Sequence, residues 1–175
     1  MAEPAPQRFT IAVIPDTQNY VDFTHQRAEG FAFDARDLMD QQLQFIADNA
    51  VSRGGDIVFA TAVGDVWQHP IIDIDPDHAA RGFRPRPAPA GAGVAAWADG
   101  VRNVEIPAAI AAYDRIDGVL PFSVVSGNHD YDGQWWDEQW PQDLTAPPGD
   151  LRRLGMIHIG GLTAFTQAFG ATSKY

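Results

Sequence analysis

Cysteine is absent from this 175-residue chain, and positive charge is scarce, with 12 Lys and Arg residues against 23 Asp and Glu residues. The lack of cysteine excludes disulfide bonds and thiolate zinc sites. The net charge of −11 argues against a nucleic-acid backbone as the main partner, because no basic patch offsets the repulsion. No apolar run is long enough to predict a membrane span.

The length and the hydrophobic content of 45% are those of one domain with its own core. We expect residues 1–7 to be a disordered N-terminus and residues 8–175 to form the domain, with a Pro/Ala/Gly-rich insertion at about 69–102. Residues 1–6 lack the positive and apolar regions of a signal peptide. They are either the start of an exported mature protein, periplasmic or extracellular, or the frayed end of a cytoplasmic one.

Three apolar runs predict strands, at residues 8–14, 56–63 and 121–125. Near-continuous apolar strands of this kind are typical of a parallel sheet that is buried on both faces. Amphipathic periodicity predicts helices at 34–53 and at about 103–117, each ending at glycine and each connecting two of the strands. The expected fold class is therefore α/β.

Each predicted strand ends in polar residues, which places Asp16, Asp65, Asn128 and His129 at one edge of the sheet. Ligands and catalytic groups gather at this edge of open α/β sheets. Oxygen-rich clusters of this type bind divalent metals, and two such ions can hold a phosphate for in-line attack.

These residues carry a family resemblance. Asp16-x-Gln18, Gly64-Asp65 and Gly127-Asn128-His129-Asp130 resemble, in order, the first three motifs of the calcineurin-like metallophosphoesterases. The family usually has His where this chain has Gln18, and the run Ile14–Tyr20 is similar to a bacterial, often exported branch that carries Gln there. The resemblance implies an αββα sandwich, of which this chain would supply the N-terminal parallel β-α-β-α-β portion.

The family's two later motifs, a lone His and a Gly-His-x-His word, have no match here. His158 is the only histidine after His129, and its surroundings differ from the family pattern. The resemblance therefore implies a domain that is incomplete at its C-terminus, with an open sheet edge and exposed apolar surface that favour self-association.

The resemblance also implies a site that holds two divalent metal ions (Mn, Fe, Zn or Mg). Asp65 would bridge them, Asp16 would hold one and Asn128 the other, while Gln18 either binds a metal or stays outside its shell. A hydroxide bridging the ions would hydrolyse a phosphomonoester or phosphodiester. His129 would assist the leaving oxygen and Asp130 would orient His129, since imidazole titrates near neutrality.

A competing hypothesis is a catalytically silent fragment or module that binds a carbohydrate or envelope component. Trp135, Trp136 and Trp140 follow the third motif and either stack on a ligand or pack a loop, and packing is the commoner role. The acidic run 73–77 fails the EF-hand pattern and is expected to be a solvated loop. His69 and His78 follow the second motif and either reach the edge of the site or, as is commoner for loop histidines, lie at the surface.

Overall fold

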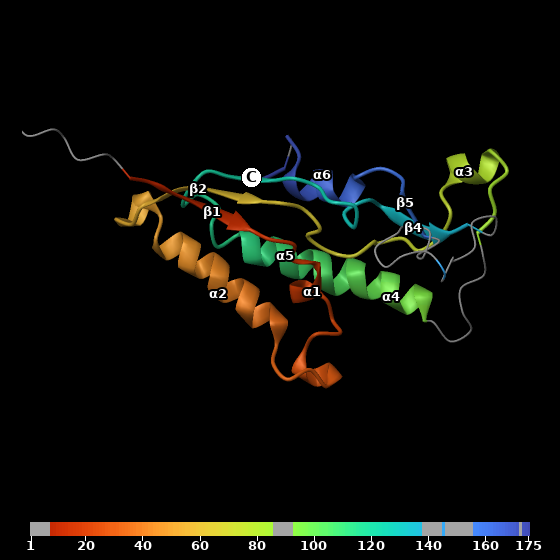
Figure 1. Cartoon of the computed structure of the whole chain (residues 1–175), viewed down its shortest axis with the longest axis horizontal. Coiled ribbons are helices and arrows are strands. Elements are labelled where there is room, and N and C mark those ends of the chain that lie inside the picture. Colours follow the sequence, from red (N-terminus) through yellow and green to blue (C-terminus); the bar gives the residue numbers. More distant parts are fainter. Residues whose placement is uncertain (1–7, 86–92, 138–144, 146–155, 172) are drawn as a thin grey trace, which may run out of the picture.

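The sheet contains three parallel strands, β1 (Thr10–Ile14), β2 (Ile57–Ala62) and β3 (Phe122–Val124), in the order β1-β2-β3. This computed structural model describes residues 8–85, 93–137, 145, 156–171 and 173–175. Together with the helices, the small parallel sheet confirms the α/β class. The carboxyl ends of the strands point toward an antiparallel hairpin of β4 (Gly133–Trp136) and β5 (Met156–Ile159) (Figure 1).

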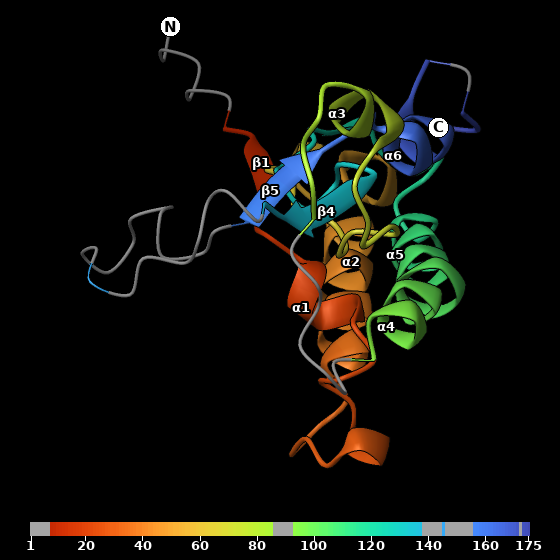
Figure 2. The same ribbon diagram turned by 90° about the vertical axis from the view of Figure 1, so that its right-hand side faces the viewer.

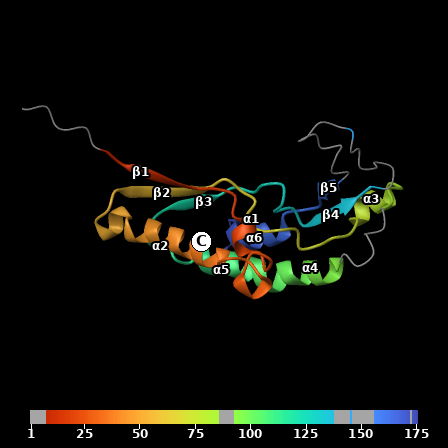
Figure 3. The same cartoon turned by 60° about the horizontal axis from the view of Figure 1, so that its bottom comes forward.

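Helices cover one face of the sheet (Figure 3). The α-helices are α1 (Gln18–Val21), α2 (Ala35–Asp48), α3 (Pro76–Ala80), α4 (Val94–Gly100), α5 (Ile106–Tyr113) and α6 (Thr163–Phe169). Short 3-10 turns span η1 (Arg27–Glu29) and η2 (Val51–Arg53). Small residues of β2, Ala60 and Ala62, are buried in the same core as side chains of α2, α5 and α6. Their size lets the helices approach the sheet closely.

The prediction of a sheet buried on both faces is wrong for the described residues. Ile11 and Val13 of β1 are 50% and 62% exposed, and Val63 and Val125 beyond β2 and β3 are 54% and 52% exposed. These side chains alternate with the helix-facing ones, so they lie on the opposite face. In the described part of the chain that face is bare and mostly apolar, apart from one pair of hydrogen-bonded hydroxyl side chains, which agrees with the exposed apolar surface expected above.

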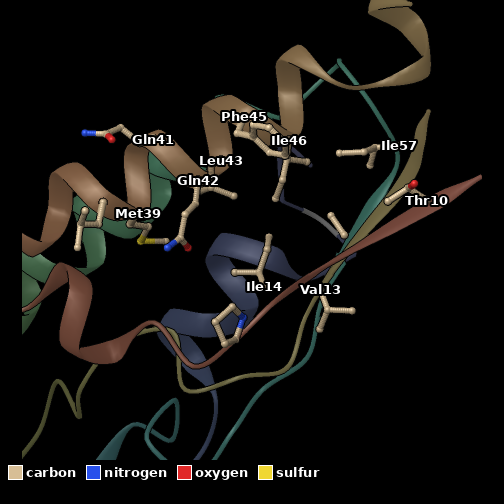
Figure 4. A pocket seen from close by; sticks show the side chains of 13 residues that line it. Thr10, Val13, Ile14, Met39, Gln41, Gln42, Leu43, Phe45, Ile46 and Ile57 are labelled. Carbon is tan, nitrogen blue, oxygen red and sulfur yellow. The ribbon is translucent and has the colours of Figure 1, made fainter. Parts of the chain in front are cut away.

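Helix α2 confirms the first predicted helix, although it ends at Asp48 and a separate 3-10 turn follows. Its buried side chains are Ala35, Met39, Leu43, Ile46 and Ala47, whereas Phe45 is 63% exposed. A groove of about 490 Å³ runs between α2 and the edge strand β1. Figure 4 shows Ile14 pointing toward α2 across this groove, and Val13 on the other side of the strand.

The second predicted helix starts earlier than expected. Helix α4 continues through a π-helical turn, η3 (Val101–Glu105), into α5. Pro107 in the first turn of α5 has no N–H to donate, and the π turn lies directly before it, where the hydrogen-bond ladder is interrupted. The expected insertion at 69–102 contains α3 and α4, and its residues 86–92 lie outside the described part.

Figure 2 views the molecule from the end that carries the hairpin. There α4 and α5 form one column beside α2, and the segment between α1 and α2 extends away from the sheet. Residue Ile71, after β2, pairs with Gly133 of β4, so the loop leaving β2 connects the sheet to the hairpin. This pairing brings the hairpin to the carboxyl ends of the strands.

Candidate functional site

The loops that follow β1, β2 and β3 meet at Asp65. Its carbonyl oxygen accepts hydrogen bonds from the backbone N–H groups of Thr17 (3.1 Å) and Gln18 (2.9 Å). Its Oδ1 accepts a hydrogen bond from the backbone N–H of His129 (2.8 Å). One residue therefore joins all three strand-end segments, and the structure brings together the residues that the sequence placed at this edge.

The two glycines of these motifs permit the close approach of the loops. A Cβ on Gly127 would lie 2.1 Å from Oδ1 and 2.5 Å from the backbone N of Asp65. A Cβ on Gly64 would lie 2.4 Å from the backbone N of Gly127. Asp65 itself has a φ of 51°, in the left-handed region that Asp and Asn tolerate better than most residues. The junction therefore requires a residue without a Cβ at both glycine positions.

Asp130 is fully buried and organises the backbone of the junction. Its Oδ1 accepts the N–H of Val66 and its Oδ2 accepts the N–H of Gly127, both at 2.8 Å. Burial raises the pKa of Asp130 to about 6, although these backbone hydrogen bonds oppose the shift. Both carboxylate oxygens are engaged with backbone groups, so the contact expected between Asp130 and the ring of His129 is made by another residue.

That residue is Gln68. Its Oε1 lies 2.7 Å from Nδ1 of His129, so the neutral imidazole donates through Nδ1 and carries its lone pair on Nε2. Burial lowers the pKa of His129, while the negative charges of Asp65 and Asp16 raise it. The sequence offered no signal for this contact, because Gln68 lies three residues after the second motif and its role depends on the loop geometry.

His129 belongs to a cluster of three imidazoles with His69 and His158. The ring centroid of His129 lies 5.1 Å from that of His69 and 5.2 Å from that of His158. Nδ1 of His69 lies 2.9 Å from the carbonyl oxygen of Tyr131 and must donate to it. Nε2 of His69 is then the acceptor at 2.7 Å from Nδ1 of His158, which leaves the Nε2 of His158 with a lone pair.

His69 reaches the site, as one of the two alternatives had it, and the commoner surface role is wrong because the residue is 1% exposed. Burial lowers the pKa of His69 to about 4, and burial also lowers the pKa of His158. His158 reaches the cluster because β5 pairs with β4, with His158 opposite Gln134. This long-range pairing explains why the residues around His158 gave no indication of a place in the site.

Glu105 is a second site residue that the sequence did not indicate. It is fully buried in the π turn, and its Oε2 accepts the backbone N–H of Gln68 at 3.0 Å. Its Oε1 is buried without a hydrogen-bond partner. Burial raises the pKa of Glu105 to about 7. Glu105 therefore supports the residue that in turn orients His129.

The donor set at the strand ends fits a hard divalent cation. Asp16 is exposed, and its carboxylate accepts the Nε2–H of Gln18 at 3.1 Å. This leaves Oε1 of Gln18 buried without a partner, a position at which a cation or its bound water would satisfy it. The amide of Asn128 is exposed, and Oδ2 of Asp65 makes no hydrogen bond to another described residue. These oxygens suit magnesium or manganese.

A compact group of metal-ligand type occurs elsewhere, at Asp75, Asp77 and His78. Asp75 is the N-cap of α3 and accepts hydrogen bonds from both the backbone N–H and the Nδ1 of His78, at 3.0 Å each. The prediction of a solvated acidic loop is thus wrong at Asp75, which caps a helix. The same contacts account for the closeness of the group without a metal.

The predicted packing role holds for Trp135, which is 1% exposed and lies against His78 and Phe83. Trp136 differs, because it lines a cavity of about 280 Å³ together with His129. Trp140 lies outside the described residues. The aromatic run after the third motif is therefore divided between the interior and the site.

A change at Glu105 should alter the pH dependence of stability. A carboxyl whose pKa rises from 4.5 to about 7 on folding binds protons more tightly in the folded state. The free energy of unfolding therefore falls as pH rises through this window. Glu105→Gln should be more stable than the parent protein at pH 8 by roughly 1–3 kcal/mol and close to it at pH 5. Urea unfolding at the two pH values measures this.

The exposed Glu29 provides the matched control. Glu29→Gln should unfold with the pH dependence of the parent protein. If the difference in the free energy of unfolding between Glu105→Gln and the parent protein were the same at pH 5 and pH 8, the raised pKa of Glu105 would be contradicted.

No helix in the described part of the chain is long and apolar enough to cross a membrane. Comparisons of the chain with protein-family models, with curated proteins and with solved structures find no match. The site at the strand ends is therefore interpreted from its own geometry and chemistry.

Proposed function

We propose that this chain carries the strand-end half of a metal-dependent phosphoesterase site of the calcineurin-like type, in an αββα fold of which the three-stranded sheet is one part. The observation that carries the proposal is the convergence of all three motifs on Asp65 through backbone and side-chain hydrogen bonds. The exposed apolar face of the sheet also fits such a fold, whose second sheet would cover it. The substrate is a phosphomonoester or a phosphodiester.

We assign two divalent ions to these strand-end oxygens. Asp65 would contribute to both, Asp16 with Oε1 of Gln18 would hold one, and the amide oxygen of Asn128 would hold the other. When bound, such ions neutralise phosphate charge and lower the pKa of water so that it becomes a nucleophile at neutral pH. His158 has a lone pair on Nε2, so it could serve as a metal ligand in addition to these oxygens. The sequence pattern did not reveal this imidazole.

His129 supplies the proton for the leaving oxygen. Its Nδ1 is held by Gln68, which leaves Nε2 as the atom that exchanges protons with substrate. The free imidazole is biased toward the neutral form by burial. The negative charge of a bound phosphate acts in the opposite direction, because it raises the pKa of a nearby histidine. We assign to His129 the donation of a proton through Nε2 as the P–O bond breaks.

Metal stoichiometry tests the proposal. Calorimetric titration with manganese should show two ions per chain, and Asp65→Asn should lose at least one of them. Asp56→Asn is the matched control, because Asp56 is exposed at the opposite end of β2, where it accepts a hydrogen bond from Thr10. Binding of one ion or none by the unmodified chain would favour a silent binding module over an enzyme.

A further inference from the structure

A cavity of about 280 Å³ opens beside His129. Its wall is formed by Trp97 of α4, by Gln134 and Trp136 of β4, and by Gln68 in the loop after β2. Gln134 and Trp136 lie two positions apart in the strand and therefore face the same side, while Trp135 between them points into the interior. The cavity is thus adjacent to the imidazole proposed to protonate the leaving group.

The wall is neutral apart from His129. It presents two indole rings and two side-chain amides, with Ile72 and Val94 completing it. The edge of one ring system fits this size, since the volume lies at the lower end of small-molecule sites. A charged group would have no partner of opposite sign among these residues, so the cavity suits an uncharged part of a ligand.

Among the described residues, several wall groups have no partner that would compete with a ligand. Trp97 packs edge to face on Phe23 at 5.1 Å, but Trp136 makes no ring contact with any described residue. Oε1 of Gln68 is occupied by His129, which leaves its Nε2 as a donor. The amide of Gln134 forms no hydrogen bond to another described side chain. Together they offer a stacking surface with amide donors and an acceptor beside it.

We propose that this cavity binds the alcohol portion of the phosphoester, and that this portion is a flat, uncharged ring with hydrogen-bonding groups on its edge. The inference rests on the proposed function. Flat rings stack on indole faces, and side-chain amides pair with the donor and acceptor edge of such rings, as glutamine does with adenine. Nucleosides belong to this class, as do other heteroaromatic alcohols.

The first test uses adenosine, which has the ring but no phosphate. Binding is followed by the indole N–H signals of the protein in two-dimensional NMR. Adenosine should shift the signals of Trp97 and Trp136, whereas methyl glucoside, a ring that is not flat, should not. Trp136→Leu should weaken adenosine binding about 10-fold or more, and Trp136→Phe should restore most of it. Phe45→Leu, an exposed aromatic on α2, should have no effect.

The second test compares hydrolysis of adenosine monophosphate and glycerol phosphate. Trp136→Leu and Gln134→Leu should raise KM for the nucleotide about 10-fold and leave that for glycerol phosphate unchanged. Adenosine binding without hydrolysis of either ester would support the cavity and refute the phosphoesterase. Hydrolysis of both esters with no adenosine binding, or with a preference for methyl glucoside, would overturn the inference and leave the phosphoesterase standing.

Discussion

Replacing Gly127 by alanine should destabilise the protein by about 3 kcal/mol or more, because the new Cβ overlaps atoms that cannot move freely. The Cβ would lie 2.1 Å from Oδ1 and 2.5 Å from the backbone N of Asp65. Asp65 is fixed in turn by its hydrogen bonds to Thr17, Gln18 and His129. Relief of the overlap therefore requires all three strand-end loops to separate.

Gly118 supplies the control for this substitution. It has a φ of 67° with open space where a Cβ would lie, so Gly118→Ala introduces backbone strain without overlap. We expect a loss of about 1 kcal/mol there. Urea unfolding measures both variants. If Gly127→Ala were no less stable than Gly118→Ala, the close junction at Asp65 would be contradicted.

Replacing His129 by alanine should lower kcat about 10²- to 10⁴-fold for a phosphoester of an alkyl alcohol, because a poor leaving group needs its proton during bond cleavage. The loss should be much smaller for a p-nitrophenyl ester, since that leaving group departs readily as an anion. Gln68→Leu should give a smaller loss of the same kind, about 10-fold, by releasing the imidazole from its orientation. Steady-state rates with the two esters measure the difference.

Equal losses with the two leaving groups would contradict the assignment of His129 as proton donor and would indicate a role in binding phosphate. Asp130→Asn separates the two neighbours in the motif. The carboxylate of Asp130 accepts hydrogen bonds from the backbone N–H groups of Val66 and Gly127. Asp130→Asn should therefore lower the stability of the protein and leave the ratio of the rates with the two esters unchanged.

The strands and the strand-end site were accessible from the sequence for a simple reason. Runs of β-branched and apolar residues that end in Asp or Asn report a local property, the exit of a strand from the core. Parallel pairing then brings Asp16, Asp65 and Asn128 to one edge without further information. The strand pattern alone did not show that one face of the sheet is bare, because apolar side chains at Ile11 and Val13 do not indicate what lies over them. Exposed apolar surface was expected only from the family resemblance.

Two of the remaining errors originate in long-range contacts. Glu105 is charged and lies on a helix, so its burial depends on the packing of the π turn against the loop after β2. His69 and His158 are 89 residues apart, and only the pairing of β5 with β4 brings their rings together. Helix α4 was missed because the Pro- and Gly-rich residues before it dominate the composition of that region.

Manganese-dependent hydrolysis of bis(p-nitrophenyl) phosphate tests the central claim most directly. The comparison is between the unmodified chain, Asp65→Asn and Asp56→Asn. Asparagine at position 65 tolerates the observed φ of 51°, so this variant removes the charge while keeping the backbone. We expect turnover that requires manganese, that Asp65→Asn abolishes and that Asp56→Asn retains. Turnover by the unmodified chain no greater than that of Asp65→Asn would contradict a phosphoesterase site at the strand ends.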